Sequence, residues 1–364
     1  MIASLFLQAA IGQRAGVGRY VHTLVPHLAE VRGGDSLHGF YFDFRGKGSP
    51  FPTSLLPQTA IRWVPGALVQ QAWKRLQFPP ADLLAPQADV LHFPNFVIPP
   101  IRRRTRAVVS IHDASFLRFP ETLEPKNLAY LRSQIPKTLQ RAERILTISE
   151  TIAAELREAF SLPAERVVAT LLGPPPLTAS PDAQVRKTFD LERPFLLHVG
   201  TLEPRKNHAF LFQLMDALAD QDLDLVLCGM EGWQVEPILA AMAACKSRAR
   251  IRQLRYVTDA QLAGLYQQAE ALVFPSLYEG FGLPPVEAMQ WGCPVMCSDG
   301  GSLPEVVGGG GCVLPLSLEA WREAVPQVRA ARERWIAAGR ERAAEFSWRR
   351  CAEETWQVYR EAAQ

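Results

Sequence analysis

The sequence lacks the features that mark membrane-spanning and disulfide-stabilised proteins. No apolar run among its 364 residues approaches the roughly 18 consecutive residues that a transmembrane helix needs. Its six cysteines all lie in the C-terminal half, and none has the C-x-x-C spacing typical of zinc sites. We therefore expect a soluble protein of the reducing cytosol.

The N-terminus lacks the positive charge that opens a signal peptide. Met1–Leu7 is mostly apolar from its first residue, so it predicts a first strand rather than an export signal. The chain is 48% apolar and 21% charged, which is typical of globular proteins. Its length suggests two or three domains.

The chain also lacks a strong net charge, since the total is only +2, but the charges are unevenly spread. Residues 1–173 hold 20 basic and 13 acidic residues, a net of +7, which leaves −5 for the remainder. This asymmetry suggests that the first half meets an anionic partner, such as lipid, nucleic acid or a phosphorylated acceptor. A chance difference between solvated faces explains it equally well.

Short β-branched runs alternate with amphipathic segments along nearly the whole chain. In the first half the runs predict strands at Ile2–Leu7, Phe40–Phe44, Ile61–Val64, Asp89–Phe93, Ala107–Ile111, Arg144–Ile148 and Val167–Thr170. Helices are predicted at Val17–Val31, Lys126–Ala142 and Glu150–Phe160, the last capped by Ser149. Three prolines follow Gly173, and Pro174–Pro176 can continue neither a helix nor a central strand, so a domain boundary is expected there.

A second alternating series follows this boundary. It predicts strands at Phe195–Val199, Asp224–Cys228, Ile251–Arg255, Ala271–Phe274, Pro294–Cys297 and Gly311–Leu314. The last fifty residues predict continuous helix, with Trp335, Trp348 and Trp356 available for packing.

Strands that alternate with helices favour parallel sheets that are covered on both faces. The sequence thus predicts an α/β protein with two Rossmann-like, doubly wound domains, residues 1–173 and 174–345, facing a central cleft. Residues 346–364 are expected to form a C-terminal helix that returns to the first domain. Ligands of such sheets bind at the carboxyl ends of the strands, so the cleft is the expected binding site.

The most informative segment is Pro275–Met289, which follows the predicted strand Ala271–Phe274. Gly280 and Gly282 permit a tight loop, and two prolines after them suit the first turn of a helix. A glycine-rich loop that ends in a helix N-terminus is suited to bind an anion.

Two carboxylates accompany this loop. Glu279 precedes the predicted helix and Glu287 lies near its start, where neither could bind phosphate. Both are suited to accept hydrogen bonds from hydroxyls, one from a sugar and one from a ribose. The plainer alternative makes Glu287 a partner of the helix dipole and Glu279 a solvated turn residue.

A second segment, His198–Asn207, ends the first predicted strand of the second domain. Arg205 and Lys206 there precede Asn207, which marks the start of a helix. Arg205 could clamp a diphosphate with its planar guanidinium group, and Lys206 could bind it as a point charge. Solvated surface charges are the alternative, although cations are disfavoured at that end of a helix.

Together these segments resemble the retaining glycosyltransferases of family 4, which have the GT-B fold. The E-x7-E motif is present as Glu279 and Glu287, and the pattern G-T-L-E-P-R-K-N occupies residues 200–207. Further similar segments are Gly16–Tyr20, Ile111–Asp113, Leu146–Ser149 and Ser302–Val306, so the resemblance covers most of the chain.

The resemblance implies roles for individual residues. Glu287 would bind the ribose hydroxyls, Glu279 would face the transferred sugar, and Arg205 and Lys206 would hold the diphosphate. The other implied donor-binding residues are Gly16, Gly18, Tyr256, Val257, Gly280, Phe281, Gly282 and Leu283.

His112 would hydrogen-bond the donor sugar near the reacting carbon, so the implied catalytic group is His112, Glu279, Arg205 and Lys206. The alternative for His112 is a neutral histidine satisfied by local backbone. Its position at a predicted strand's carboxyl end favours the functional role.

No cluster of metal ligands accompanies the phosphate motifs, so we expect no metal and no resident cofactor. Asp222-Leu223-Asp224 imitates the metal-binding D-x-D of another glycosyltransferase fold. Because it precedes its strand instead of following it, we interpret it as a solvated turn.

The resemblance implies a glycosyltransferase that moves mannose or a related hexose, with GDP-mannose as the leading donor, to a glycan or lipid-linked acceptor. Bacterial surface polysaccharide is the implied product, and no nucleic acid is expected as a partner. Two alternatives stay open: a nucleotide-sugar epimerase of similar fold, and a non-catalytic sugar-nucleotide binding protein.

The basic first half also suggests a peripheral position on the inner face of the cell membrane. The predicted contact is Arg102–Arg106, which holds four arginines beside the apolar Phe96–Pro100. An ordinary exposed loop leading into a strand is the alternative.

Overall fold

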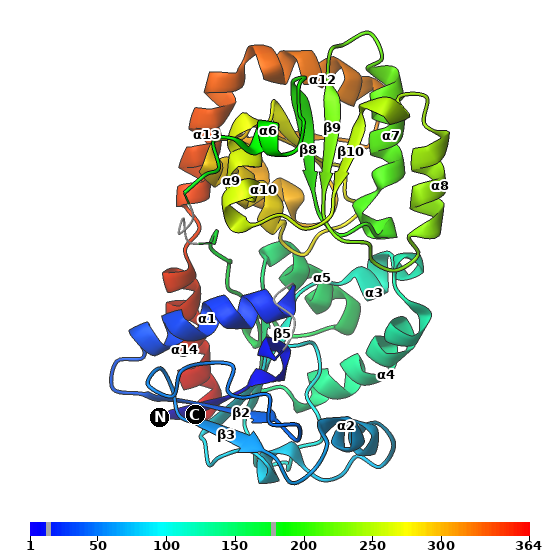
Figure 1. The fold of residues 1–364 in the computed structure, drawn as a ribbon. Coiled ribbons are helices and arrows are strands. Elements are labelled where there is room, and N and C mark those ends of the chain that lie inside the picture. Colours follow the sequence, from blue (N-terminus) through cyan, green and yellow to red (C-terminus); the bar gives the residue numbers. More distant parts are fainter. Residues whose placement is uncertain (12–15, 176–179) are drawn as a thin grey trace. The chain divides into compact units, whose positions relative to one another are not determined.

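A computed structural model describes residues 1–11, 16–175 and 180–364, and in it the chain forms two compact units (Figure 1). Unit 1 comprises Met1–Phe116, Pro125–Gly173 and Ser347–Gln364, and unit 2 comprises Leu117–Glu124 and Pro174–Phe346. The chain therefore changes unit between Gly173 and Pro174, although Pro176 of the predicted boundary lies outside the described residues.

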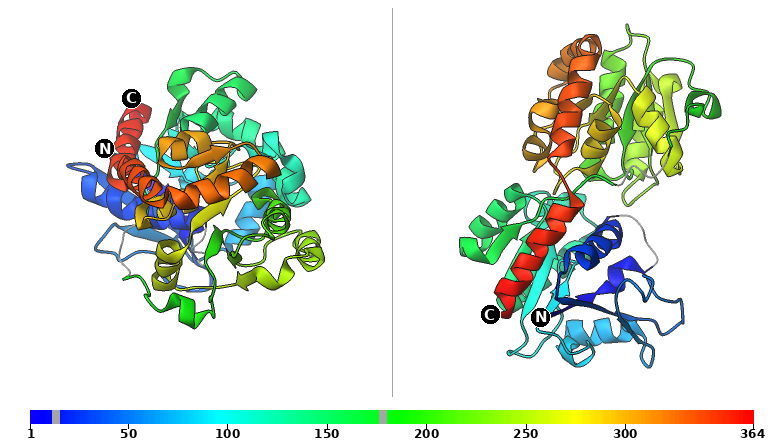
Figure 2. Two further views of the ribbon diagram at one scale, coloured as in Figure 1. Left: turned by 90° about the horizontal axis from the view of Figure 1, so that it is seen from above. Right: turned by 90° about the vertical axis from the view of Figure 1, so that its left-hand side faces the viewer.

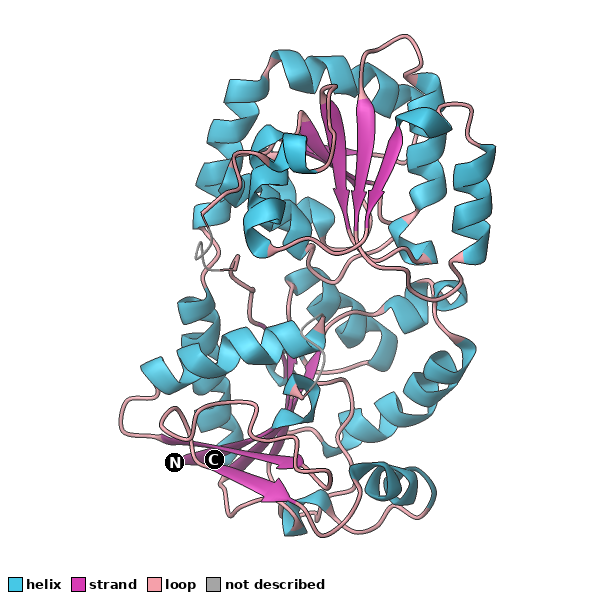
Figure 3. Ribbon diagram, viewed as in Figure 1, coloured by secondary structure: helices cyan, strands magenta, loops and turns pink. Residues whose placement is uncertain are grey.

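Unit 1 is built on a seven-stranded parallel sheet with the order β3-β2-β1-β4-β5-β6-β7 (Figure 3). Its strands are β1 (Ile2–Phe6), β2 (Ser36–Phe42), β3 (Gln58–Ile61), β4 (Val90–Phe93), β5 (Ala107–Ile111), β6 (Arg144–Thr147) and β7 (Val167–Ala169). The helices of this part of the chain are α1 (Val17–Val31), α2 (Gly66–Arg75), α3 (Ser115–Arg118), α4 (Pro125–Arg141), α5 (Glu150–Phe160) and α14 (Trp348–Ala363). The third strand was predicted three residues too late, because Arg62–Pro65 is the connection into α2, a helix that the sequence pattern did not predict.

As predicted, the C-terminal helix packs on the first domain: α14 lies beside α1 (Figure 2). A buried chain of hydrogen bonds joins it to the sheet. The Tyr359 hydroxyl is 2.7 Å from Nδ1 of His92, whose Nε2 is 2.8 Å from the Ser110 hydroxyl. Burial lowers the pKa of His92 to about 3, so its imidazole is neutral and can accept one of these bonds.

Unit 2 is built on a six-stranded parallel sheet with the order β10-β9-β8-β11-β12-β13. Its strands are β8 (Phe195–Val199), β9 (Asp224–Cys228), β10 (Ile251–Leu254), β11 (Ala271–Phe274), β12 (Val295–Ser298) and β13 (Cys312–Leu314). Its helices are α6 (Val185–Thr188), α7 (His208–Ala217), α8 (Glu236–Ala244), α9 (Asp259–Gln268), α10 (Leu283–Trp291), α11 (Leu303–Val307), α12 (Leu318–Ala330) and α13 (Arg332–Ala344). Every residue of β9, β11 and β12 is buried, which explains their apolar sequences, since helices cover both faces of such sheets.

The prediction of one continuous C-terminal helix is wrong. Helices α12, α13 and α14 are separated at Ala331 and at 345–347. Phe346 is buried against the ring of Phe281 in unit 2, whereas Trp348 packs against Tyr20 in unit 1. The hydroxyl of Ser347 accepts the Arg350 N–H and begins the new helix. The chain thus breaks its helix where it passes from one unit to the other.

Leu117–Glu124 is the other departure from the predicted domains, because this short segment of the first half belongs to unit 2. The indole N–H of Trp233 donates to the carbonyl of Thr122 at 2.8 Å. The ring of Phe119 lies 5.7 Å from that of Tyr278. These contacts are formed by residues more than a hundred positions apart, which no local pattern predicts.

Candidate active site

Two loops of unit 2 meet at the point where the strand order of the sheet reverses. One loop follows β8 and the other follows β11, and these strands are neighbours in the sheet although β9 and β10 lie between them in the sequence. Sheets of this kind bind their ligands at such a switch point. The loops are joined directly, because the Leu277 N–H donates to the Arg205 carbonyl at 2.8 Å and the Arg205 guanidinium donates to the Tyr278 carbonyl at 2.7 Å.

The loops bring together two cations and two carboxylates. Arg205 lies 2.9 Å from a carboxylate oxygen of Glu279 and 2.8 Å from one of Glu203. Lys206 Nζ lies 2.6 Å from the other oxygen of Glu279. Glu203, Lys206 and Glu279 are all buried. We call these four residues the charge cluster.

Glu279 is the carboxylate most strongly affected by the cluster. Burial would raise its pKa, but the charges of Arg205 and Lys206 outweigh burial and hold the pKa at about 2. For Glu203 burial prevails over Arg205, so its pKa is raised. Glu279 is therefore the firmly ionised partner of both cations.

The loop that carries Glu279 is supported from behind by the segment after β12. The hydroxyl and the N–H of Ser302 both donate to the carbonyl of Glu279, each at 3.0 Å. Gly301 has a φ of +62°, and a Cβ there would lie 2.4 Å from the same carbonyl oxygen. Only glycine permits this approach, which accounts for the Gly-Gly-Ser sequence at 300–302.

The start of α10 differs from the predicted anion site. Gly282 precedes the helix with a φ of +95°, and Pro284 and Pro285 occupy its first turn. Proline has no N–H, so these positions cannot contribute donors to an anion. The backbone N–H groups that remain for the predicted anion site are therefore those of Gly280–Leu283.

Glu287 and the two cations take positions close to those predicted. Glu287 is buried on α10 and accepts a hydrogen bond from the Tyr266 hydroxyl of α9 at 3.2 Å. Arg205 and Lys206 lie in a separate turn, Pro204–Lys206, rather than in the helix itself. Asn207 then adopts the left-handed conformation that starts α7.

The remaining predicted donor-binding residues of unit 2 do not join the charge cluster. Tyr256 and Val257 follow β10, and Tyr256 is the most exposed large apolar residue in the described chain, at 79%. Phe281 is buried against Phe346, so its side chain contributes to packing.

The other predicted site residues, His112, Gly16 and Gly18, belong to unit 1. Gly16 has a φ of +54° just before α1, and Gly18 is buried in that helix. The His112 ring lies 4.7 Å from that of Tyr20, also on α1. Its Nε2 is 2.8 Å from the Pro94 carbonyl, and burial lowers its pKa, so a neutral ring donates to the backbone. The local contact matches the structural alternative, and its Nδ1 atom is the one left for a ligand.

Sequence reasoning missed Glu203 as a member of the site. Glu203 stands two residues before Arg205, in the same strand-to-helix loop as both predicted cations. This position is the sequence signal by which it could have been found. Arg205 and Lys206 predicted a phosphate site, in which a carboxylate was not expected.

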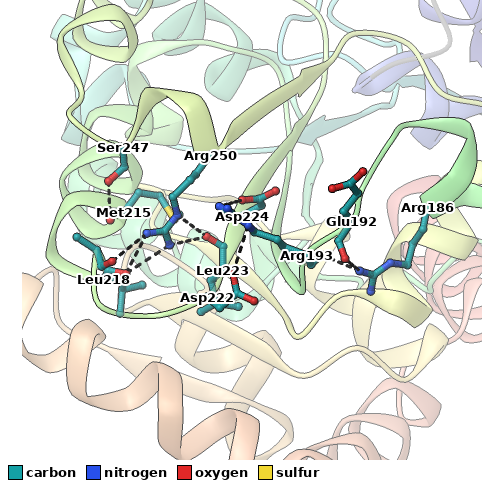
Figure 4. Close-up of polar contacts among 11 residues, drawn as sticks. Arg186, Glu192, Arg193, Met215, Leu218, Asp222, Leu223, Asp224, Ser247 and Arg250 are labelled. Atoms are coloured by element: carbon teal, nitrogen blue, oxygen red, sulfur yellow. Dashed lines mark hydrogen bonds and ion pairs between the residues drawn. The ribbon is translucent and has the colours of Figure 1, made fainter.

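The Asp222-Leu223-Asp224 segment lies at the amino end of β9 (Figure 4). Arg193 contacts both carboxylates, at 3.3 Å for Asp222 and 3.7 Å for Asp224. Asp222 is exposed as predicted, but Asp224 is buried, so only half of the segment is a solvated turn. Within the described ranges, no three His, Cys, Asp or Glu residues are grouped to hold a metal ion.

Comparison with known proteins identifies the class of this chain. Its residues 180–342 match the family model described as glycosyl transferases group 1, and residues 14–173 match glycosyltransferase family 4. The chain belongs to the glycosyltransferase family that these two models describe, group 1 in its second half and family 4 in its first. The predicted α/β GT-B fold is confirmed.

Particular relatives have more specific names. The chain is 35% identical over 283 residues to O-antigen chain mannosyltransferase B of Escherichia coli, covering 74% of each chain. It is 26% identical to O-antigen chain mannosyltransferase RfbU of Salmonella typhimurium, over 64% of this chain and 63% of that one. Sucrose-phosphate synthase of Thermosynechococcus elongatus has a similar structure, with a TM-score of 0.78 and 18% identity over 99% of this chain and 98% of that one.

Proposed function

We propose that this glycosyltransferase moves mannose or a related hexose from a nucleoside diphosphate sugar, GDP-mannose first, to a hydroxyl of a glycan or lipid-linked acceptor. The anomeric configuration is retained and no divalent metal takes part. The names of its relatives favour mannose and O-antigen synthesis. The charge cluster at the switch point of unit 2 is the observation that carries the proposal.

The cluster is suited to a diphosphate because it concentrates two cations without a metal. Arg205 and Lys206 are paired with Glu203 and Glu279. A diphosphate that binds them must compete with Glu279. The carboxylate then accepts hydrogen bonds from sugar hydroxyls, which is the role expected for it at the donor sugar.

The proposed mechanism is mainly electrostatic. As the glycosidic bond breaks, negative charge grows on the leaving diphosphate, and two preorganised cations stabilise that charge more than they stabilise the ground state. Glu287 holds the ribose, and the acceptor hydroxyl attacks from the same face while its proton passes to the leaving phosphate.

A donor and acceptor assay tests the proposal. The enzyme is incubated with GDP-mannose, and separately with UDP-glucose, with and without a mannose-terminated oligosaccharide. We expect an α-linked product that requires the acceptor and GDP-mannose. Conversion of the nucleotide sugar to its epimer without acceptor would indicate an epimerase, and donor binding without turnover would indicate a binding protein. Either result refutes transfer.

A further inference from the structure

The exposed apolar side chains of unit 1 are concentrated in one stretch. Within the described part of unit 1, every large apolar side chain that is exposed lies between positions 44 and 83. Trp63 and Leu76 are 72% and 73% exposed. The full set, which we call the α2 surface, is Phe44, Trp63, Leu68, Leu76, Phe78 and Leu83.

The topology brings much of the α2 surface together. Phe42 pairs with Ile61 in the parallel β2–β3 ladder, so Phe44 and Trp63, each two residues further on, leave the same edge of the sheet. Trp63 is three residues before α2. The helix then carries the surface about 15 Å further, to Leu76 at its C-terminal end.

Helix α2 buries one apolar face and exposes further apolar side chains on its solvent side. Val69 and Trp73 are buried, and Trp73 packs on Phe42. Leu68 immediately precedes Val69, so it points about 100° away from Val69 around the helix axis, and it is exposed. The Trp73 indole donates to the Pro79 carbonyl at 2.7 Å, which holds the loop that carries Phe78.

The charges around this surface have one sign. Residues 44–81 contain Arg45, Lys47, Arg62, Lys74 and Arg75 and no acidic residue. The flanking acids are buried and paired, Asp43 with Arg62 and Asp82 with Arg102. Lys74 lies over the Tyr130 ring of α4, a helix that also has no acidic residue.

We propose that the α2 surface binds the surface of an anionic lipid bilayer. Aromatic side chains favour the interface, leucines enter the acyl boundary, and cations are attracted by anionic headgroups. Gln70 and Gln71 are also exposed on α2 and are suited to hydrogen-bond a glycan, so glycan binding is the alternative that the test must exclude. The inference does not depend on the donor chemistry of unit 2.

The membrane contact predicted from Arg102–Arg106 is a poorer candidate. Arg102 and Arg106 are paired with Asp82 and Glu143, at 2.5 and 2.8 Å. The neighbouring apolar residues Ile98–Pro100 are buried and cannot enter lipid. None of the described helices is long and apolar enough to cross a membrane.

Vesicle co-sedimentation tests the inference with the full chain. The vesicles are phosphatidylcholine with about 30% phosphatidylglycerol, compared with pure phosphatidylcholine at low salt. Leu68→Gln with Leu76→Gln should lower vesicle affinity at least about tenfold. Arg45→Gln with Arg75→Gln should lower it about fivefold for each charge removed, and salt should weaken binding of the unaltered protein.

Two matched controls locate the effect. Met230→Gln with Leu316→Gln removes two exposed apolar side chains of unit 2, and Arg103→Gln with Arg104→Gln removes two charges of the alternative loop. Both should bind vesicles within about twofold of the unaltered protein.

The inference is overturned by an absence of binding at low salt, by equal losses in either control, or by self-association through Leu68 and Leu76. It is also overturned if Trp63→Gln impairs use of a soluble glycan but leaves vesicle binding unchanged. Transfer to a soluble acceptor should persist in the Leu68→Gln, Leu76→Gln variant, so failure of this inference is distinguishable from failure of the proposed function.

Discussion

Replacing Glu279 with Gln should separate the stability of unit 2 from its affinity for a diphosphate. Glu279 pairs with both Arg205 and Lys206, at 2.9 and 2.6 Å. A pKa that falls from 4.5 to about 2 corresponds to roughly 3 kcal/mol in favour of the ionised carboxylate. Glu279→Gln should therefore destabilise unit 2 by about 3 kcal/mol at pH 7, in line with the loss of a buried ion pair.

The same substitution should strengthen binding of the nucleoside diphosphate. Two unit charges 4 Å apart interact by about 4 kcal/mol at the effective dielectric of a protein, so removing the competing carboxylate need release only a third of this to give tenfold tighter binding. We expect GDP to bind Glu279→Gln about tenfold more tightly, while transfer becomes slower because the sugar has lost an acceptor.

Thermal unfolding with a GDP titration measures both quantities. The melting temperature without ligand should fall by roughly 6–12 °C, since 1 kcal/mol shifts a domain of this size by about 2–4 °C. Two variants serve as controls: Lys206→Ala should weaken GDP binding, and Glu353→Gln, which breaks an exposed pair on α14, should shift stability by at most about 1 kcal/mol. The reasoning is refuted if Glu279→Gln abolishes GDP binding in a folded protein while Glu287→Gln does not, because the two carboxylates would then have each other's roles.

The stability difference should also depend on pH. Because the pKa of Glu279 is lowered in the folded state, its contribution is fully present above its unfolded value of 4.5 and is lost as the pH falls toward about 2. The gap between the unaltered protein and Glu279→Gln in urea unfolding should be constant from pH 7 to 5 and should narrow below pH 4.5. A gap that widens in acid would contradict the assigned ion pairs.

Two further predictions concern donor binding. Glu287→Gln should weaken GDP binding about ten- to a hundredfold by calorimetry, because a charge-assisted bond to a ribose hydroxyl is worth roughly 1.5–3 kcal/mol. Tyr266→Phe, which removes the hydroxyl that donates to Glu287, should retain most of the affinity, and equal losses in both variants would indicate a structural role. Transfer should survive excess EDTA, because Arg205 and Lys206 supply the positive charge at the proposed diphosphate site; loss on chelation that magnesium or manganese restores would show that the diphosphate site is misplaced.

The predicted secondary structure has the fewest errors where interactions between residues close in sequence decide it. Helix Glu150–Phe160 was predicted with its bounds, because Ser149 caps it through the Ile152 N–H. Strands such as Phe195–Val199 and Ala271–Phe274 were also predicted with their bounds, since strands buried on both faces are continuous apolar runs. The two loops of the site were identifiable because each directly follows one of these strands.

The tertiary structure alone decided which charges meet and which apolar residues stay exposed. Glu279 pairs with Lys206 across 73 positions and shares Arg205 with Glu203, which no spacing rule predicts. The apolar Ile98–Pro100 is buried, whereas Trp63 and Leu76 are exposed, although all are apolar in sequence. Hydrophobic periodicity indicates which face of a segment can be buried. Which charges pair and which apolar side chains stay exposed depends on the distant segment that packs against it. That choice is made by the whole fold, because the free energy of a buried charge or an exposed side chain is set by its neighbours in space.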